Sequence, residues 1–157
     1  MGLKRKTKVL SIIALLVLPL LVPWANATFS DFKINSHFDD RDVTLIGSHG
    51  RFKVQATYYD GTHAVGTGYY GTFFDTIYLL TVRSDNVVEG NPNNLNAFLR
   101  SHQTLMVYKI KKDDDGQYIL RRLEEDPRLG MHESKIEVAG FFGPLSSIPT
   151  FKPKQAL

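Results

Sequence analysis

Apolar and polar residues alternate along most of the chain with a period of two, which is the pattern of half-buried β-strands. The clearest example is Arg51–Tyr59, where every second residue from Phe52 to Tyr58 is apolar. β-branched and aromatic residues fill Asp75–Val82, so this segment is predicted as a more fully buried strand. Further strands are expected at Phe29–Ile34, Thr104–Lys111, Gln117–Leu123 and Lys135–Ala139.

Turn residues separate these segments. Lys112–Gly116 joins two of them in the clearest hairpin of the chain. Helical spacing occurs in Leu95–His102, which follows a long polar loop at Ser84–Asn94. Six to eight short strands with turns about every ten residues are typical of an antiparallel sandwich or barrel. We expect an all-β, Ig-like β-sandwich, and a small closed β-barrel is the alternative.

The first 27 residues contain the three parts of an export signal. Four basic side chains lie in residues 4–8, an apolar run extends over Val9–Val22, and Ala25–Ala27 is a small-x-small cleavage box. The 14-residue run has the length of a signal core and is shorter than the roughly 20 residues that span a bilayer. We therefore expect cleavage after residue 27 and a secreted single domain at residues 28–157, with no membrane span after cleavage and a Pro-rich tail from about residue 144.

Loss of the signal changes the charge of the protein. The full chain has 19 lysines and arginines against 16 acidic residues, and four of the basic residues lie in the signal. The remaining 15 leave a net charge of about −1, which argues against a nucleic-acid partner. The chain has no cysteine, which excludes disulfides, a thiolate nucleophile and cysteine-based metal sites.

Two motifs resemble ligand-binding loops, one for a dinucleotide and one for calcium, but the residues around them do not fit those ligands. Gly66–Gly71 matches the GxGxxG pattern of dinucleotide loops, but residues of strand composition follow it, so we interpret the glycines as a bulged or tightly bent strand. Asp113–Gly116 has the carboxylates of a calcium loop, but an EF-hand frame would put cations at two ligand positions. We favour a hairpin turn and predict no metal or cofactor. Asp113, Asp115 and His37 are the weak metal-ligand candidates.

Carboxylates that could support hydrolysis occur at Asp39–Asp40 and Glu124–Asp126. A glycosidase would have to hold such a pair about 5–9.5 Å apart across a cleft. Gly47–Gly50 places Ser48 beside His49, but adjacent side chains rarely form a nucleophile–base pair. We therefore assign no catalytic residue, and a small secreted carboxylate-dependent hydrolase is an alternative function.

Three aromatic doublets, Tyr58-Tyr59, Tyr69-Tyr70 and Phe73-Phe74, lie within 17 residues. In a strand, one ring of each doublet points into the core and the other points outward. Outward rings can stack on sugars or pack against a protein, whereas cross-strand pairing that stabilises the sheet is the competing interpretation. The candidate ligand-binding residues are Tyr59, Tyr69, Tyr70 and Phe74.

The chain has a recognisable order of segments: the export signal comes first, then the strand at Phe29–Ile34, and later the hairpin formed by Leu105–Ile110 and Asp115–Tyr118. In this layout it resembles the small exported β-sandwich proteins of unknown function found in Bacillus-like bacteria. The resemblance implies a fold and an extracellular location, and it implies no site residues.

The period-two pattern, the aromatic doublets and the missing catalytic signature favour a non-catalytic extracellular binding or interaction module. Its expected partner is a glycan or a protein at the cell surface. Two alternatives to the binding module remain: the hydrolase described above, and a secreted antagonist or inhibitor.

Overall fold

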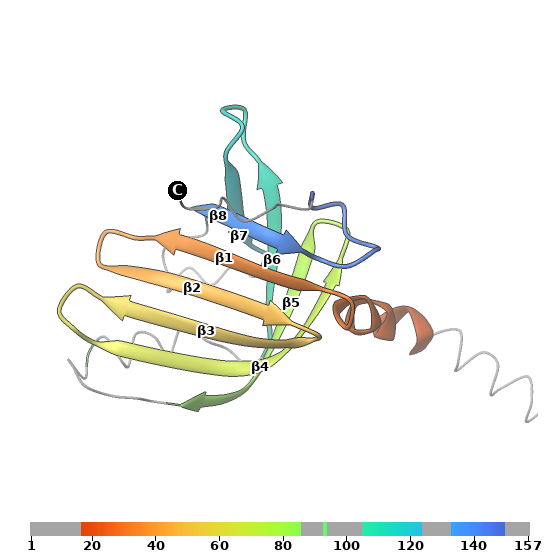
Figure 1. Ribbon diagram of the computed structural model, residues 1–157, viewed down its shortest axis with the longest axis horizontal. Helices are drawn as coiled ribbons and strands as arrows, with labels where there is room; N and C mark the ends of the chain where they lie inside the picture. The colour runs from red at the N-terminus through yellow and green to blue at the C-terminus, as the bar shows by residue number, and fades with distance from the viewer. Residues whose placement is uncertain (1–16, 86–92, 94–104, 124–132, 150–157) are drawn as a thin grey trace, which may run out of the picture.

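A computed structural model describes residues 17–85, 93, 105–123 and 133–149 of the chain. In these residues eight strands follow one another, each antiparallel to the next, and β1 also pairs with β8, so the sheet closes into a barrel (Figure 1). The strands are β1 (Asp31–His37), β2 (Arg41–Ser48), β3 (Arg51–Tyr58), β4 (His63–Phe73), β5 (Thr76–Asp85), β6 (Leu105–Lys112), β7 (Tyr118–Arg122) and β8 (Glu133–Phe141).

The antiparallel all-β class is confirmed, and the architecture is the closed barrel that was the alternative, not the Ig-like sandwich that we favoured. A sandwich would divide the strands between two sheets, whereas here six residue pairs between β1 and β8 close one continuous sheet. Both architectures alternate inward and outward side chains along every strand. The hydrophobic pattern is therefore the same for both.

Most predicted strands are confirmed, and β3 matches its prediction within one residue. The sequence pattern missed β2, because Leu45 and Ile46 are adjacent apolar residues on opposite faces and Gly47 occupies an inward position without a side chain. The predicted helix at Leu95–His102 and most of the loop at Ser84–Asn94 lie outside the described residues, as do Glu124–Asp126 and the last eight residues of the tail.

The GxGxxG segment lies within β4, and its interpretation as a bulged strand is confirmed. The register between β4 and β5 shifts between Thr67 and Gly68. A Cβ on Gly68 would collide with the carbonyl oxygen of Leu80 and lie 2.8 Å from the ring of Phe52. Glycine is therefore required by the close approach of β4 and β5.

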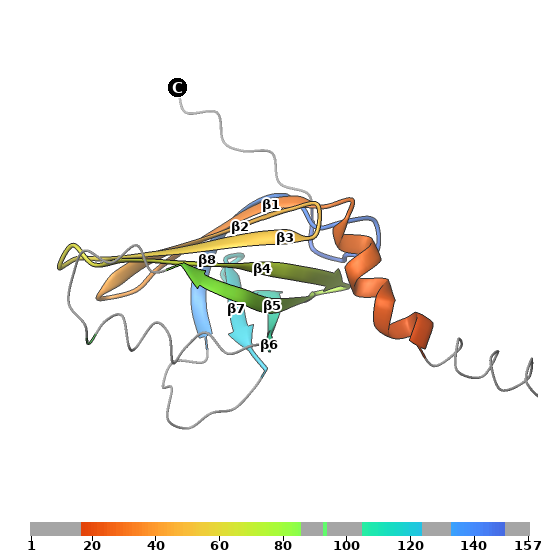
Figure 2. The same cartoon turned by 90° about the horizontal axis from the view of Figure 1, so that it is seen from below.

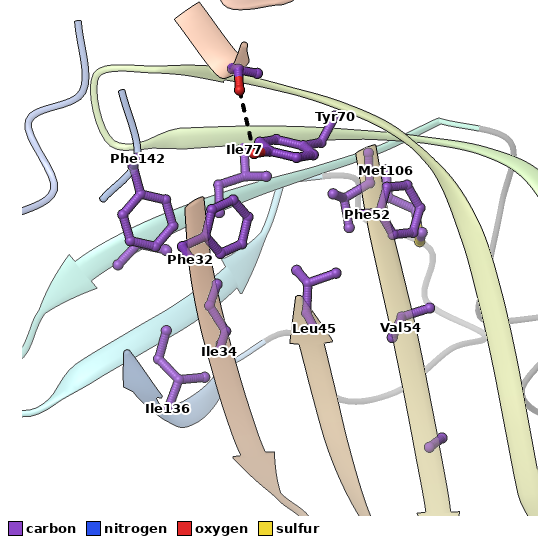
Figure 3. Close-up of a cluster of buried hydrophobic side chains, with 14 of the residues drawn as sticks. Phe32, Ile34, Leu45, Phe52, Val54, Tyr70, Ile77, Met106, Ile136 and Phe142 are labelled. Carbon is purple, nitrogen blue, oxygen red and sulfur yellow. Dashed lines mark hydrogen bonds between the residues drawn. The ribbon is translucent and has the colours of Figure 1, made fainter. Parts of the chain in front are cut away.

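Inward side chains fill the barrel with a continuous apolar core (Figure 3). The ring of Phe32 stacks on that of Phe142 with centroids 4.3 Å apart, and it meets Tyr70 edge-on at 5.1 Å. Gly47 leaves room for Phe32, because a Cβ there would lie within 2.6 Å of the phenyl ring. A core of this kind needs no disulfide at this chain length.

A helix at residues 17–27 leads into β1 and lies at the end of the barrel where β1 begins (Figures 1 and 2). Its last two residues, Asn26 and Ala27, are buried. In the part of the chain that the structure describes, no helix has the length and apolar character needed to cross a membrane. Cleavage after Ala27 remains a prediction.

Candidate functional site

The four aromatic candidates do not form one surface. Tyr70 is a core residue with no exposed area, and Tyr59, Tyr69 and Phe74 are exposed. Tyr69 pairs with Arg51 at the beginning of β3, whereas Tyr59 follows the end of that strand, a separation of roughly 20 Å or more. The structure therefore places the candidate rings at opposite ends of the barrel.

The hydroxyl of Tyr70 joins the core to the segment before β1. It lies 2.6 Å from Ser30 Oγ and 3.2 Å from the Ser30 carbonyl oxygen. Burial raises the pKa of Tyr70, and the hydrogen bond with Ser30 opposes this rise. Tyr70 is thus a structural residue, held by packing and by a hydrogen bond.

Two of the weak metal-ligand candidates, Asp113 and His37, are engaged in local contacts. Asp113 accepts a hydrogen bond from the backbone N–H of Asp114 at 2.8 Å, within the β6–β7 turn that Gly116 closes at a φ of 80°. His37 Nδ1 lies 2.8 Å from Asp42 Oδ1. Among the described residues, no three histidines or carboxylates gather as a metal site would require.

The structure does bring Ser48 and His49 together, contrary to the expectation for adjacent residues. His49 has a φ of 49°, and this left-handed backbone turns its ring so that Nδ1 lies 2.8 Å from Ser48 Oγ. The pair lies on the exposed β2–β3 turn. Within the described residues no carboxylate contacts His49, so the third group of a triad is missing there.

The described residues include a groove beside β1 and β8, with a volume of about 600 Å³. This volume falls within the range of about 300–1,000 Å³ typical of ligand pockets. β7 pairs with β8 along four residues, Tyr118–Arg121, and the β6–β7 hairpin then departs from the sheet (Figure 1). The polar side chains of the groove are Lys33, Asn35, His37, Gln117, Lys135 and Glu137.

The strand register explains why these side chains share one face. Asn35 pairs with Glu137 and Lys33 pairs with Ala139 across the β1–β8 ladder, so outward positions of the two strands lie side by side. Ala139 is the small member of its pair and leaves space beside Lys33. We refer to this surface, defined by Lys33, Asn35, His37, Gln117, Tyr118 and residues 135–139, as the β1–β8 groove.

Neighbouring side chains orient two polar groups of the groove. Thr44 Oγ1 donates to Asn35 Oδ1 at 3.0 Å, so the amide nitrogen of Asn35 is directed to the other side as a donor. Asp42 binds Nδ1 of His37, which leaves Nε2 as its outer nitrogen. The groove therefore combines two lysine cations with amide and imidazole groups that can donate hydrogen bonds, and with one carboxylate acceptor.

The sequence indicated His37 only as a weak metal-ligand candidate, and it gave no sign of Lys33, Asn35 and Lys135 as site residues. Along each strand these residues match the polar face of any half-exposed strand. Their grouping depends on the pairing of the first strand with the last, which no local pattern contains. Neither family models, nor curated proteins, nor solved structures provide a match to this chain.

Proposed function

We propose that this chain is an exported, non-catalytic binding protein and that its β1–β8 groove holds an acidic glycan at the cell surface. The observation that carries the proposal is the pairing of two lysines with oriented polar groups in one groove. Lys33 and Lys135 supply cations for a carboxylate or phosphate carried by the sugar chain. Asn35, Gln117 and Glu137 supply the donors and the acceptor that sugar hydroxyls require.

The charged side chains of the groove favour a charged glycan, because a sugar ring can cover the apolar part while the lysines bind an acidic group. Tyr118, Ile136, Val138 and Ala139 contribute the apolar part, and Lys33, Lys135 and Glu137 contribute the charges. Exposed lysines contribute modestly to affinity and strongly to its dependence on salt. Binding is therefore weak for a single sugar unit and gains strength when several units of a polymer bind together.

The test uses the full chain in zwitterionic detergent micelles and measures its affinity for a uronic-acid disaccharide and for a neutral disaccharide of the same size. We expect the acidic sugar to bind more tightly, with a preference that falls as salt rises. Lys33→Ala and Lys135→Ala should each weaken binding of the acidic sugar about fivefold.

Lys53→Ala is the matched control. Lys53 is also an exposed, outward-facing residue within a strand. Ile46 pairs with Lys33 on one side and with Lys53 on the other, so the two lysines occupy equivalent positions two strands apart, but Lys53 is not part of the groove. Equal affinity for both sugars, or equal loss in the Lys33, Lys135 and Lys53 variants, would overturn the proposal.

A further inference from the structure

Asn26, the middle residue of the cleavage box, is an integral part of the folded barrel. Its side chain is buried and donates from Nδ2 to the carbonyl oxygen of Thr72 at 2.9 Å, to Thr72 Oγ1 at 2.8 Å and to the carbonyl oxygen of Phe142 at 3.2 Å. Its Oδ1 accepts a hydrogen bond from the backbone N–H of Leu145 at 2.8 Å. One side chain thus joins β4 to the segment after β8.

Ala27 is equally integrated. It is fully buried, and its carbonyl oxygen accepts a hydrogen bond from Ser30 Oγ at 2.8 Å. The hydroxyl of Tyr70 lies 3.4 Å from the same oxygen. The bond after Ala27, where signal peptidase would cut, is therefore surrounded by core contacts.

Two glycines are shaped to fit this N-terminal segment. A Cβ on Gly71 would lie 3.0 Å from Pro23 Cβ, and a Cβ on Gly143 would lie 2.6–2.7 Å from three atoms of Asn26. Gly143 also has a φ of 95°, which other residues rarely adopt. The barrel surface is therefore complementary in shape to residues 23–27. Removal of this segment would take the Asn26 side chain away from the Leu145 N–H and the Thr72 carbonyl oxygen, which it hydrogen-bonds here.

We propose that the chain stays joined at Ala27–Thr28, that residues 23–27 cap the mature barrel, and that the apolar segment before them holds the barrel at the outer face of a lipid bilayer. The inference does not depend on which ligand the groove takes. Under this proposal the export signal still directs the chain out of the cytoplasm, but it is not cleaved.

A lipid bilayer is the occupant that suits the chain ahead of the cap. Val17, Leu18, Leu20 and Leu21 are 44–70 % exposed on the helix and belong to the uncharged run Val9–Val22 that precedes the cap. This run of 14 residues is shorter than a typical spanning helix, and local thinning of the bilayer together with extension of the flanking lysines to the interface would make up the difference. The basic residues at positions 4–8 favour a cytoplasmic N-terminus, which places the barrel outside.

The first experiment expresses the full chain in a bacterial host and measures its intact mass in the membrane and medium fractions. We expect the membrane fraction to contain the full-length 17.8 kDa chain, and we expect detergent, but not alkaline carbonate, to release it. Recovery in the medium of a chain that begins at Thr28 would overturn the proposal.

A second measurement uses Asn26→Ala, which leaves an Ala-Ala-Ala box and therefore keeps the small-x-small pattern. In a retained chain, we expect this variant to lower the thermal midpoint of the barrel by about 10 °C, because several buried hydrogen bonds are lost. In a cleaved chain the substitution would be absent from the mature protein, so an unchanged midpoint would contradict the proposal. Thr28→Ser, at an exposed position next to the same bond, keeps the hydroxyl that donates to the Ala25 carbonyl oxygen at 2.7 Å, so it is the control and should shift the midpoint little.

Discussion

At the scale of single residues, Tyr70 shows how one side chain can serve packing and polar contact together. Its ring meets Phe32 inside the barrel, and its hydroxyl reaches Ser30 at the capped end. Tyr58 is also buried, and burial raises its pKa although the Arg41 guanidinium opposes the rise. Both phenols are therefore stabilised in the neutral form in the folded protein.

Tyr70→Phe keeps the ring and removes the hydroxyl. We expect a loss of about 1 kcal/mol in the free energy of unfolding at neutral pH, because one buried hydrogen bond disappears. The pKa of Tyr70 is raised in the folded protein from a usual value of about 10. The unfolded chain thus loses this proton first, and stability that is complete below pH 10 falls as pH rises toward the folded-state pKa.

Urea unfolding at pH 7 and at pH values above 10 measures both effects. The variant should lose less stability than the parent over the alkaline range, because one ionising group has been removed. Tyr69→Phe at the exposed neighbouring position is the control. If the free energy of unfolding falls with pH above 10 as steeply in both variants as in the parent, burial of Tyr70 is not the cause of that fall.

The sequence could predict that one ring of each doublet points inward, because strand geometry requires it. It could not predict which ring, since that depends on the register with neighbouring strands. Tyr58 and Tyr70 point inward as the first and second members of their doublets, respectively. Two of the residues predicted to bind ligand, Tyr69 and Tyr70, thus have opposite environments.

At the scale of elements, β4 and β5 depend on a glycine where their register shifts. Gly68→Ala should lower the free energy of unfolding by about 2–3 kcal/mol, because the new methyl group would collide with Leu80 and Phe52. Lys53→Ala, an exposed change on the adjacent strand, should have an effect within about 0.5 kcal/mol. Urea denaturation compares the two, and equal stabilities would mean that the strands can separate at this point without cost.

The hairpin between β6 and β7 was predictable because its information is local: two apolar strands flank an Asp- and Gly-rich turn. The groove beside β8 was not predictable in the same way. It needs the pairing of β7 with β8 to begin only at Tyr118, and it needs Lys33 to lie next to Ala139. The second condition depends on residues more than 100 positions apart in the sequence, which the local pattern does not relate.

At the scale of the whole molecule, closure through β1 and β8 distinguishes the barrel from a sandwich. Asp31 and Phe141 are direct partners across this seam. Cysteines at directly paired antiparallel positions have Cα atoms about 4.5–5.5 Å apart, which suits a disulfide. The chain has no cysteine of its own, so any disulfide in a double variant must be the one introduced.

The double variant Asp31→Cys with Phe141→Cys should oxidise to a faster-migrating species on a non-reducing gel. We also expect it to raise the free energy of unfolding by about 2–4 kcal/mol. Asp31→Cys with Arg51→Cys is the control, because Arg51 lies two strands away in the same row, roughly 10 Å from Asp31. Similar oxidation of both pairs would show that the seam is not closed in solution.

The contacts of Asn26 with Phe142 and Leu145 bring the segment before β1 and the segment after β8 to one end of the barrel. The turn that joins β3 to β4, with Gly61 at its tip, lies at the other end. The two ends of the barrel are therefore distinct, and protein engineers can use this difference. A peptide inserted beside Gly61 would be presented away from the end that residues 23–27 contact, so the barrel offers a compact scaffold for peptide display.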